Sequence, residues 1–210
     1  MIPFKDDNPT STFPFITILI ISANTLVFAY QFLHPEDAQE MIFLFGAIPH
    51  YILTFETTQP IHPLLSIFTS MFMHANLVHV GGNMLYLWIF GDNVEDKLGH
   101  LRFLLFYLLC GYIAAYSHAI TTPYSLVPMI GASGAISGVL GGYMLLFPRA
   151  RVYTLLFFLF FVQIVEIPAF IVIGLWFLFQ VLNGLMSIGY QRGVAWFAHV
   201  GGFISGMILI

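Results

Sequence analysis

Six long apolar stretches determine the environment in which this chain can fold. A helix needs roughly 20 apolar residues to cross the hydrocarbon core of a bilayer. Only 8% of the residues are charged, whereas a soluble domain has about 25%. The sequence therefore predicts one all-α membrane domain over residues 1–210, a bundle of six transmembrane helices. The predicted spans are residues 15–33, 76–93, 103–120, 130–147, 168–186 and 194–210.

A seventh apolar run, residues 152–165, determines the orientation of every later helix. Its 14 residues are fewer than a span requires and typical of an interfacial segment, and Glu166 and Pro168 end it. We expect this run to lie at the membrane interface. With the N-terminus in the cytoplasm, five basic residues then lie inside and only Arg192 outside, as the positive-inside rule favours. The five are Lys5, Lys97, Arg102, Arg149 and Arg151.

The two ends and the first outer loop complete this topology. No small-residue cleavage pattern follows residues 15–33, so we expect a retained span and not a signal peptide. The last stretch reaches Ile210 without a polar tail, which fits either a native end or a truncated one. The outer loop, roughly residues 36–73, is too long to lack structure. We expect it to hold short amphipathic helices that rest in the outer leaflet.

Side chains with catalytic chemistry occur at one depth of three predicted spans. Ser133 lies near the outer start of the fourth span, and His199 lies in the second turn of the sixth. A serine hydroxyl becomes a good nucleophile when a neutral histidine takes its proton, so we expect Ser133 to attack and His199 to act as base. His79 and Asn83, in the outer half of the second span, are candidates for an oxyanion hole together with the Ser133 N–H.

Glycines at helical spacing accompany this pair. Gly134 and Gly138 follow Ser133, and Gly202 and Gly206 follow His199, as expected where two helix backbones approach closely in lipid. Packing explains the glycines but not the histidine, because a buried imidazole without a partner is costly. No acidic third member is evident, so the sequence predicts a dyad. The nearest carboxylates, Asp92, Glu95 and Asp96, occur at the inner end of the second span.

Three motifs resemble the rhomboid family of intramembrane serine proteases. They are Gly131 to Gly134 (GASG), residues 74–83 (HANLVHVGGN, with His74, His79 and Asn83), and Ala198-His199 followed by Gly202. The resemblance covers essentially the whole chain. It implies a six-helix fold with Ser133 as nucleophile, His199 as base, and His79, Asn83 and the Ser133 amide as oxyanion hole. It also implies a water-filled cavity open to the outer face and membrane-protein substrates, with one span or several, that enter laterally from the bilayer.

The chain departs from the family pattern at two places. Some members have a Trp-Arg pair in the first outer loop, where this chain has Leu65 and Ser66. Some also have a tyrosine stacked on the base, four residues after the nucleophile, where this chain has Ser137. We expect the orientation of the base to come from Trp196 or from the tight helix contact instead.

Other functions compete with proteolysis. His74, His79 and His199 are candidates for a zinc site, but there is no HExxH motif and no cysteine or carboxylate ligand nearby. An inactive rhomboid-like scaffold that binds transmembrane clients is the main alternative. A transporter is a third option, but the six predicted spans lack the evident repeat that many transporters have. We expect no cofactor, no metal and no nucleic-acid partner. The expected location is a prokaryotic plasma membrane, with the N-terminus in the cytoplasm.

Overall fold

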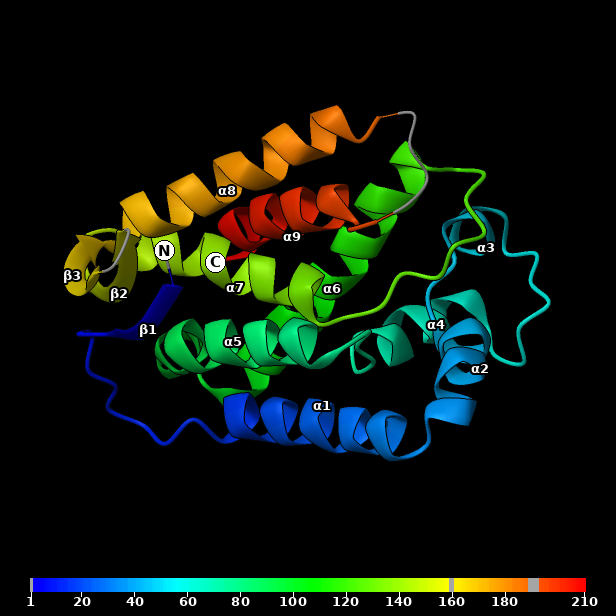
Figure 1. Cartoon of the computed structure of the whole chain (residues 1–210), viewed down its shortest axis with the longest axis horizontal. Helices are drawn as coiled ribbons and strands as arrows, with labels where there is room; N and C mark the ends of the chain where they lie inside the picture. The colour runs from blue at the N-terminus through cyan, green and yellow to red at the C-terminus, as the bar shows by residue number, and fades with distance from the viewer. Residues whose placement is uncertain (1, 159–160, 189–192) are drawn as a thin grey trace.

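Long helices lie side by side and run in alternating directions in the computed structural model of this chain (Figure 1). The structure describes residues 2–158, 161–188 and 193–210. The long helices are α1 (Phe15–Leu33), α5 (Leu77–Leu98), α6 (His100–Thr121), α7 (Ser133–Leu146), α8 (Ala169–Met186) and α9 (Trp196–Leu209). They correspond to the six predicted spans, and the first has the predicted bounds. Arg192, expected on the outer side, lies outside the described residues.

Three of these helices, α1, α6 and α8, are long and apolar enough to cross a membrane. The helices α7 and α9 are apolar but shorter, with 14 residues each. The 22-residue helix α5 carries four charged residues near its C-terminal end. The chain is thus an integral membrane protein of mainly helical structure.

A three-stranded antiparallel sheet corrects the prediction of an all-α fold. Strand β2 (Arg151–Phe158) pairs with β3 (Phe161–Pro168) on one side and with β1 (Ile2–Asp6) on the other. Residues 152–158 and 161–165 of this run therefore belong to the two strands of a hairpin, and their β-branched and aromatic residues favour extended backbone. Since the hairpin returns the chain to the same end of the bundle, α8 begins near the end of α7 (Figure 1).

Three short helices occupy the segment between α1 and α5. They are α2 (Pro35–Phe45), α3 (Pro49–Thr54) and α4 (Pro63–Ser70). Each begins with a proline, whose fixed φ and missing N–H suit the first helical position. The short helices expected in this loop are therefore present, and they cover the end of the bundle that is opposite the sheet (Figure 1).

Helices α7 and α9 pack with their backbones in contact. A Cβ atom added at Gly202 would collide with the carbonyl oxygen of Gly134, and one added at Gly206 would collide with that of Gly138. Such contact between backbones replaces side-chain packing, and it is a main source of helix association in lipid. The glycine spacing in the sequence therefore marks a real interface.

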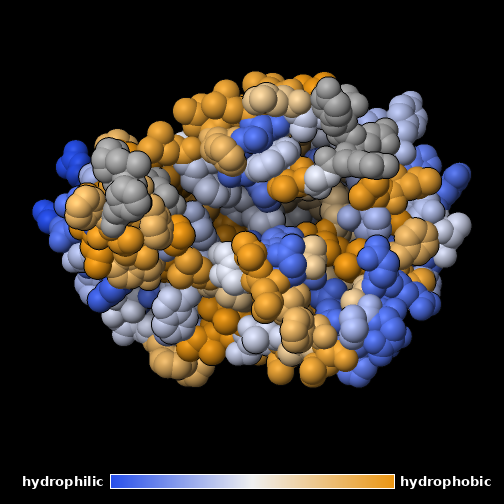
Figure 2. Space-filling model, viewed as in Figure 1, coloured by the Kyte–Doolittle hydropathy of each residue, from blue (hydrophilic) through white to orange (hydrophobic). Residues whose placement is uncertain are grey.

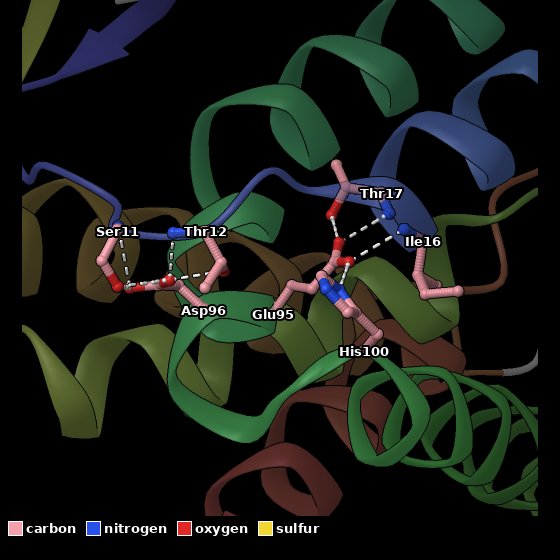
Figure 3. A network of polar contacts seen from close by, with 7 residues as sticks. All are labelled: Ser11, Thr12, Ile16, Thr17, Glu95, Asp96 and His100. Carbon is pink, nitrogen blue, oxygen red and sulfur yellow. Dashed lines mark hydrogen bonds and ion pairs between the residues drawn. The ribbon is translucent and has the colours of Figure 1, made fainter.

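A buried carboxylate joins three helices at the sheet end of the bundle (Figure 3). Glu95 of α5 is 0% exposed. It accepts hydrogen bonds from the backbone N–H groups of Ile16 and Thr17, at 2.8 and 2.7 Å, and from the Thr17 hydroxyl at 2.7 Å. The Nδ1 atom of His100, at the start of α6, lies 2.6 Å from the same carboxylate. Glu95 thus satisfies N–H groups at the start of α1 that lack acceptors within the helix.

The α7–α9 contact predicts that adding one methyl group at this interface destabilises the protein, whereas adding one elsewhere does not. Gly206→Ala should destabilise the protein by about 1–3 kcal/mol, because neither backbone can give way. Gly174→Ala, in the interior of α8, is the matched control, because nothing lies within 4 Å of its added Cβ. Thermal unfolding in detergent should show a clear fall in Tm for Gly206→Ala only. Equal Tm values for the two variants would contradict the described packing.

Candidate active site

Ser133 and His199 meet across the α7–α9 interface. Ser133 is the first residue of α7, and His199 is the fourth residue of α9. The Nε2 atom of His199 lies 2.8 Å from the Oγ atom of Ser133, although 66 residues separate them in the sequence. The imidazole is only 9% exposed. The structure therefore brings together the two residues expected to be nucleophile and base, at hydrogen-bonding distance.

A glycine turn places Ser133 at the start of its helix. Gly131 has φ +114°, a backbone conformation that favours glycine, and its N–H donates to the carbonyl of Ser70 at 2.9 Å. A Cβ atom added at Gly131 would lie 2.7 Å from Nε2 of His79 and 3.6 Å from Nδ2 of Asn83. Both side chains of α5 thus face the turn that precedes the serine. The Ser133 N–H, at the first helical position, has no acceptor within α7.

Neighbouring polar groups orient His79 and Asn83. The backbone N–H of Ala75 donates to Nδ1 of His79 at 3.4 Å, so a neutral His79 carries its proton on Nε2, the nitrogen that faces Gly131. The amide nitrogen of Asn83 donates to Nε2 of the buried His74 at 2.8 Å. An amide nitrogen has two N–H groups, so Asn83 retains a second one for another acceptor. The arrangement offers N–H donors close to Ser133.

Gln180 is a site residue that sequence reasoning missed. Its Oε1 atom lies 2.8 Å from Nδ1 of His199, and the side chain is only 4% exposed. A signal was available, because a polar residue within an apolar span is a functional-site candidate. Gln180 lies within the apolar helix α8, but no sequence motif links its amide to His199.

The rings around His199 were anticipated only in part. Trp196, which was expected to orient the base, lies edge-on with its ring centroid 6.2 Å from that of His199. Trp176 of α8 lies beside the imidazole as well, with its ring centroid 6.1 Å from that of His199. Ser137, at the position of the family tyrosine, donates to the backbone carbonyl of Ser133 at 2.6 Å. Its hydroxyl therefore bonds to backbone within its own helix.

A cavity of about 1120 Å³ opens beside Ser133 and His199. The surface is hollowed between α8 and α5, where the space-filling view shows both apolar and polar side chains (Figure 2). No Asp, Glu, Lys or Arg occurs among the described residues that line the cavity. Its polar lining includes His79, Asn83, Ser133, Gln180 and His199. The cavity thus combines room for a polypeptide segment with the candidate nucleophile, the candidate base and neutral hydrogen-bond donors.

Known proteins share this sequence pattern. Residues 62–210 match the model of the Rhomboid domain. Rhomboid protease GluP of Bacillus subtilis is 30% identical over 142 residues, which cover 67% of this chain and 25% of that protein. Rhomboid protein 1, mitochondrial, of Saccharomyces cerevisiae is 36% identical over 97 residues, 44% of this chain and 28% of that protein. RHOMBOID-like protein 1 of Arabidopsis thaliana is 30% identical over 149 residues, 70% of this chain and 34% of that protein.

These matches span only about a quarter to a third of the relatives' own lengths. The matched region of this chain nevertheless includes α5, α7 and α9, which carry Ser133, His199, His79 and Asn83. The family model also covers well over half of the 210 residues. The chain belongs to the rhomboid family.

Proposed function

We propose that this chain is an intramembrane serine endopeptidase, which cleaves transmembrane segments of other membrane proteins with Ser133 and His199 as a catalytic dyad. The observation that carries the proposal is the 2.8 Å separation of His199 Nε2 and Ser133 Oγ at the wall of a large cavity. The family itself includes proteins named proteases, such as GluP. No cofactor is needed for this reaction.

The geometry fits acyl transfer in two halves. Ser133 Oγ attacks the scissile carbonyl carbon while His199 Nε2 takes the hydroxyl proton. The tetrahedral intermediate then collapses, the peptide C–N bond breaks, and the departing amine takes the proton from His199. A water molecule attacks the resulting ester, again with His199 as base, and the carboxylic acid product leaves with Ser133 restored.

The oxyanion of both intermediates would lie between α5 and the start of α7. His79 Nε2, Asn83 Nδ2 and the Ser133 N–H are its proposed donors, since all three lie around the Gly131 turn. Preorganised donors of this kind stabilise a transition state by roughly 3 kcal/mol each.

The six long helices are proposed as six membrane spans, with the N-terminus and the sheet in the cytoplasm and the active site toward the outer face. The positive-inside distribution supports this orientation. The loop helices α2 to α4 would then rest on the outer leaflet. We also propose a prokaryotic plasma membrane as the location. One relative, GluP, is a bacterial protein, whereas Rhomboid protein 1 of Saccharomyces cerevisiae is mitochondrial.

Two other functions are less well supported. An inactive rhomboid-like scaffold would have no use for a hydrogen-bonded serine and histidine, which this chain has. A zinc site would need His199, whose two ring nitrogens already face Ser133 and Gln180. Among residues 2–158, 161–188 and 193–210, no three His, Cys, Asp or Glu side chains gather as metal ligands.

Replacing either member of the dyad should abolish cleavage. Ser133→Ala and His199→Ala should each lower kcat by about a thousandfold or more, and the double variant should be no worse, because the two groups act as one unit. The assay is gel analysis of purified protein with a panel of single-span membrane substrates. If Ser133→Ala cleaves at the wild-type rate, the serine mechanism is excluded. Activity that a chelator removes and zinc restores would favour the metal site.

The oxyanion role of Asn83 predicts a kinetic effect without a matching loss of stability. Asn83→Ala should lower kcat about tenfold to a thousandfold and change KM little, because the lost contact forms in the transition state. Asn93→Ala is the control, since Asn93 is also a buried amide of α5 and bonds to the carbonyl of Asn8 at 2.9 Å. It should lower Tm without lowering kcat. Full activity of Asn83→Ala with a large fall in Tm would make Asn83 structural.

The proposed orientation can be read by cysteine labelling in a Cys110→Ala background. Arg149→Cys, near the hairpin, should react only with reagent on the cytoplasmic side. Tyr124→Cys, between α6 and α7, should react only from outside, because the two exposed residues lie at opposite ends of α7. Labelling of both positions from the same side would overturn the span count.

A further inference from the structure

A neutral histidine can act as a base toward Ser133 only in one of its two tautomers. Its proton must lie on Nδ1, so that Nε2 has a free lone pair facing the serine hydroxyl. In serine hydrolases with a triad, a carboxylate bonded to Nδ1 selects this tautomer. No carboxylate is hydrogen-bonded to His199 among the residues that the structure describes. The tautomer must therefore be selected by another group.

The only acceptor that faces Nδ1 in the described structure belongs to Gln180. Its Oε1 atom lies 2.8 Å away, and both side chains are buried. The other end of the same amide is already engaged, because Gln180 Nε2 donates to the backbone carbonyl of Trp176, one turn earlier in α8, at 3.3 Å. This second bond determines which way the amide faces. It presents oxygen, and not nitrogen, to the imidazole.

The two tryptophans beside the base cannot take over this task. Trp176 and Trp196 contact the ring of His199, but an indole offers only an N–H donor and no acceptor. Selection of the protonated nitrogen therefore falls to Gln180.

We propose that Gln180 is the positioning residue of this active site, and that it holds His199 in the tautomer that can accept the proton of Ser133. The proposal rests on the proposed protease function. Gln180 takes no part in bond breaking. It acts through His199, by accepting the Nδ1–H hydrogen bond both in the resting base and after the base has taken the proton.

The kinetic test compares an apolar and an acidic replacement. Gln180→Met keeps the length of the side chain but has only a weak acceptor, so kcat should fall about tenfold to a hundredfold with little change in KM. Gln180→Glu restores an oxygen acceptor and should recover most of the lost kcat. The matched control is Asn183→Leu, which removes another α8 amide that bonds to a carbonyl four residues earlier, here Phe179 at 2.7 Å. It should cleave at the wild-type rate.

A second measurement is independent of turnover. Nitrogen-15 NMR of histidine-labelled protein distinguishes the tautomers, and the His199 signal is the one lost in His199→Gln. Wild type and Ser133→Ala should show the proton on Nδ1, whereas Gln180→Met should show a mixture. If wild type cleaves no substrate but the tautomer changes as described, the protease proposal fails and the positioning role stands. Unchanged kcat and an unchanged tautomer in Gln180→Met would overturn the role of Gln180.

Discussion

The contact between the backbones of α7 and α9 is the interaction on which the rest of this structure depends. In lipid, apolar side chains gain little by leaving their surroundings, so helices associate through close packing and hydrogen bonds. Gly134 with Gly202, and Gly138 with Gly206, allow the two helices to meet without intervening side chains. Because Ser133 and His199 both lie near the N-terminal ends of these helices, the glycine contacts also determine the distance between the two side chains.

The polar groups near the dyad differ in charge from those at the sheet end of the bundle. Those within hydrogen-bonding distance of Ser133 and His199 in the described structure are neutral. The opposite end carries Glu95, which binds Thr17 in the first turn of α1, and Asp96, which binds Thr12 just before α1. A cavity whose described lining has no Asp, Glu, Lys or Arg is compatible with the apolar substrate segment of the proposed function, since an uncompensated charge there would be costly to desolvate. The charged residues stabilise the scaffold instead.

Much of the helical architecture could be predicted from local sequence, because apolar length and periodicity report directly on spans. Residues 15–33 form α1 with the predicted bounds, and each short helix before α5 begins at a proline. The sheet could not be predicted in this way. It depends on pairing between Ile2–Asp6 and Arg151–Phe158, which are remote in the sequence. Length alone marked residues 152–165 as too short for a span, but not as strands.

The candidate site shows the same division between local and distant information. Ser133, His199, His79 and Asn83 were expected from motif and spacing, and the structure brings them together around one turn and one interface. Gln180 was missed because its role exists only in the packed bundle, where α8 lies against α9. An amide in an apolar helix has no motif of its own. Its importance follows from the atom it faces, which only the three-dimensional structure identifies.

The hydrogen bonds of Glu95 have a consequence for how the chain is made. The carboxylate that satisfies the first N–H groups of α1 belongs to a residue 79 positions later than Ile16. During synthesis, α1 therefore reaches the bilayer well before its cap has been translated. Until α5 arrives, those N–H groups must be solvated by water or lipid headgroups, which is possible because they lie at the first turn of the helix. Docking of α5 then exchanges solvent for a buried carboxylate, so the first turn of α1 is satisfied only when α5 packs against it.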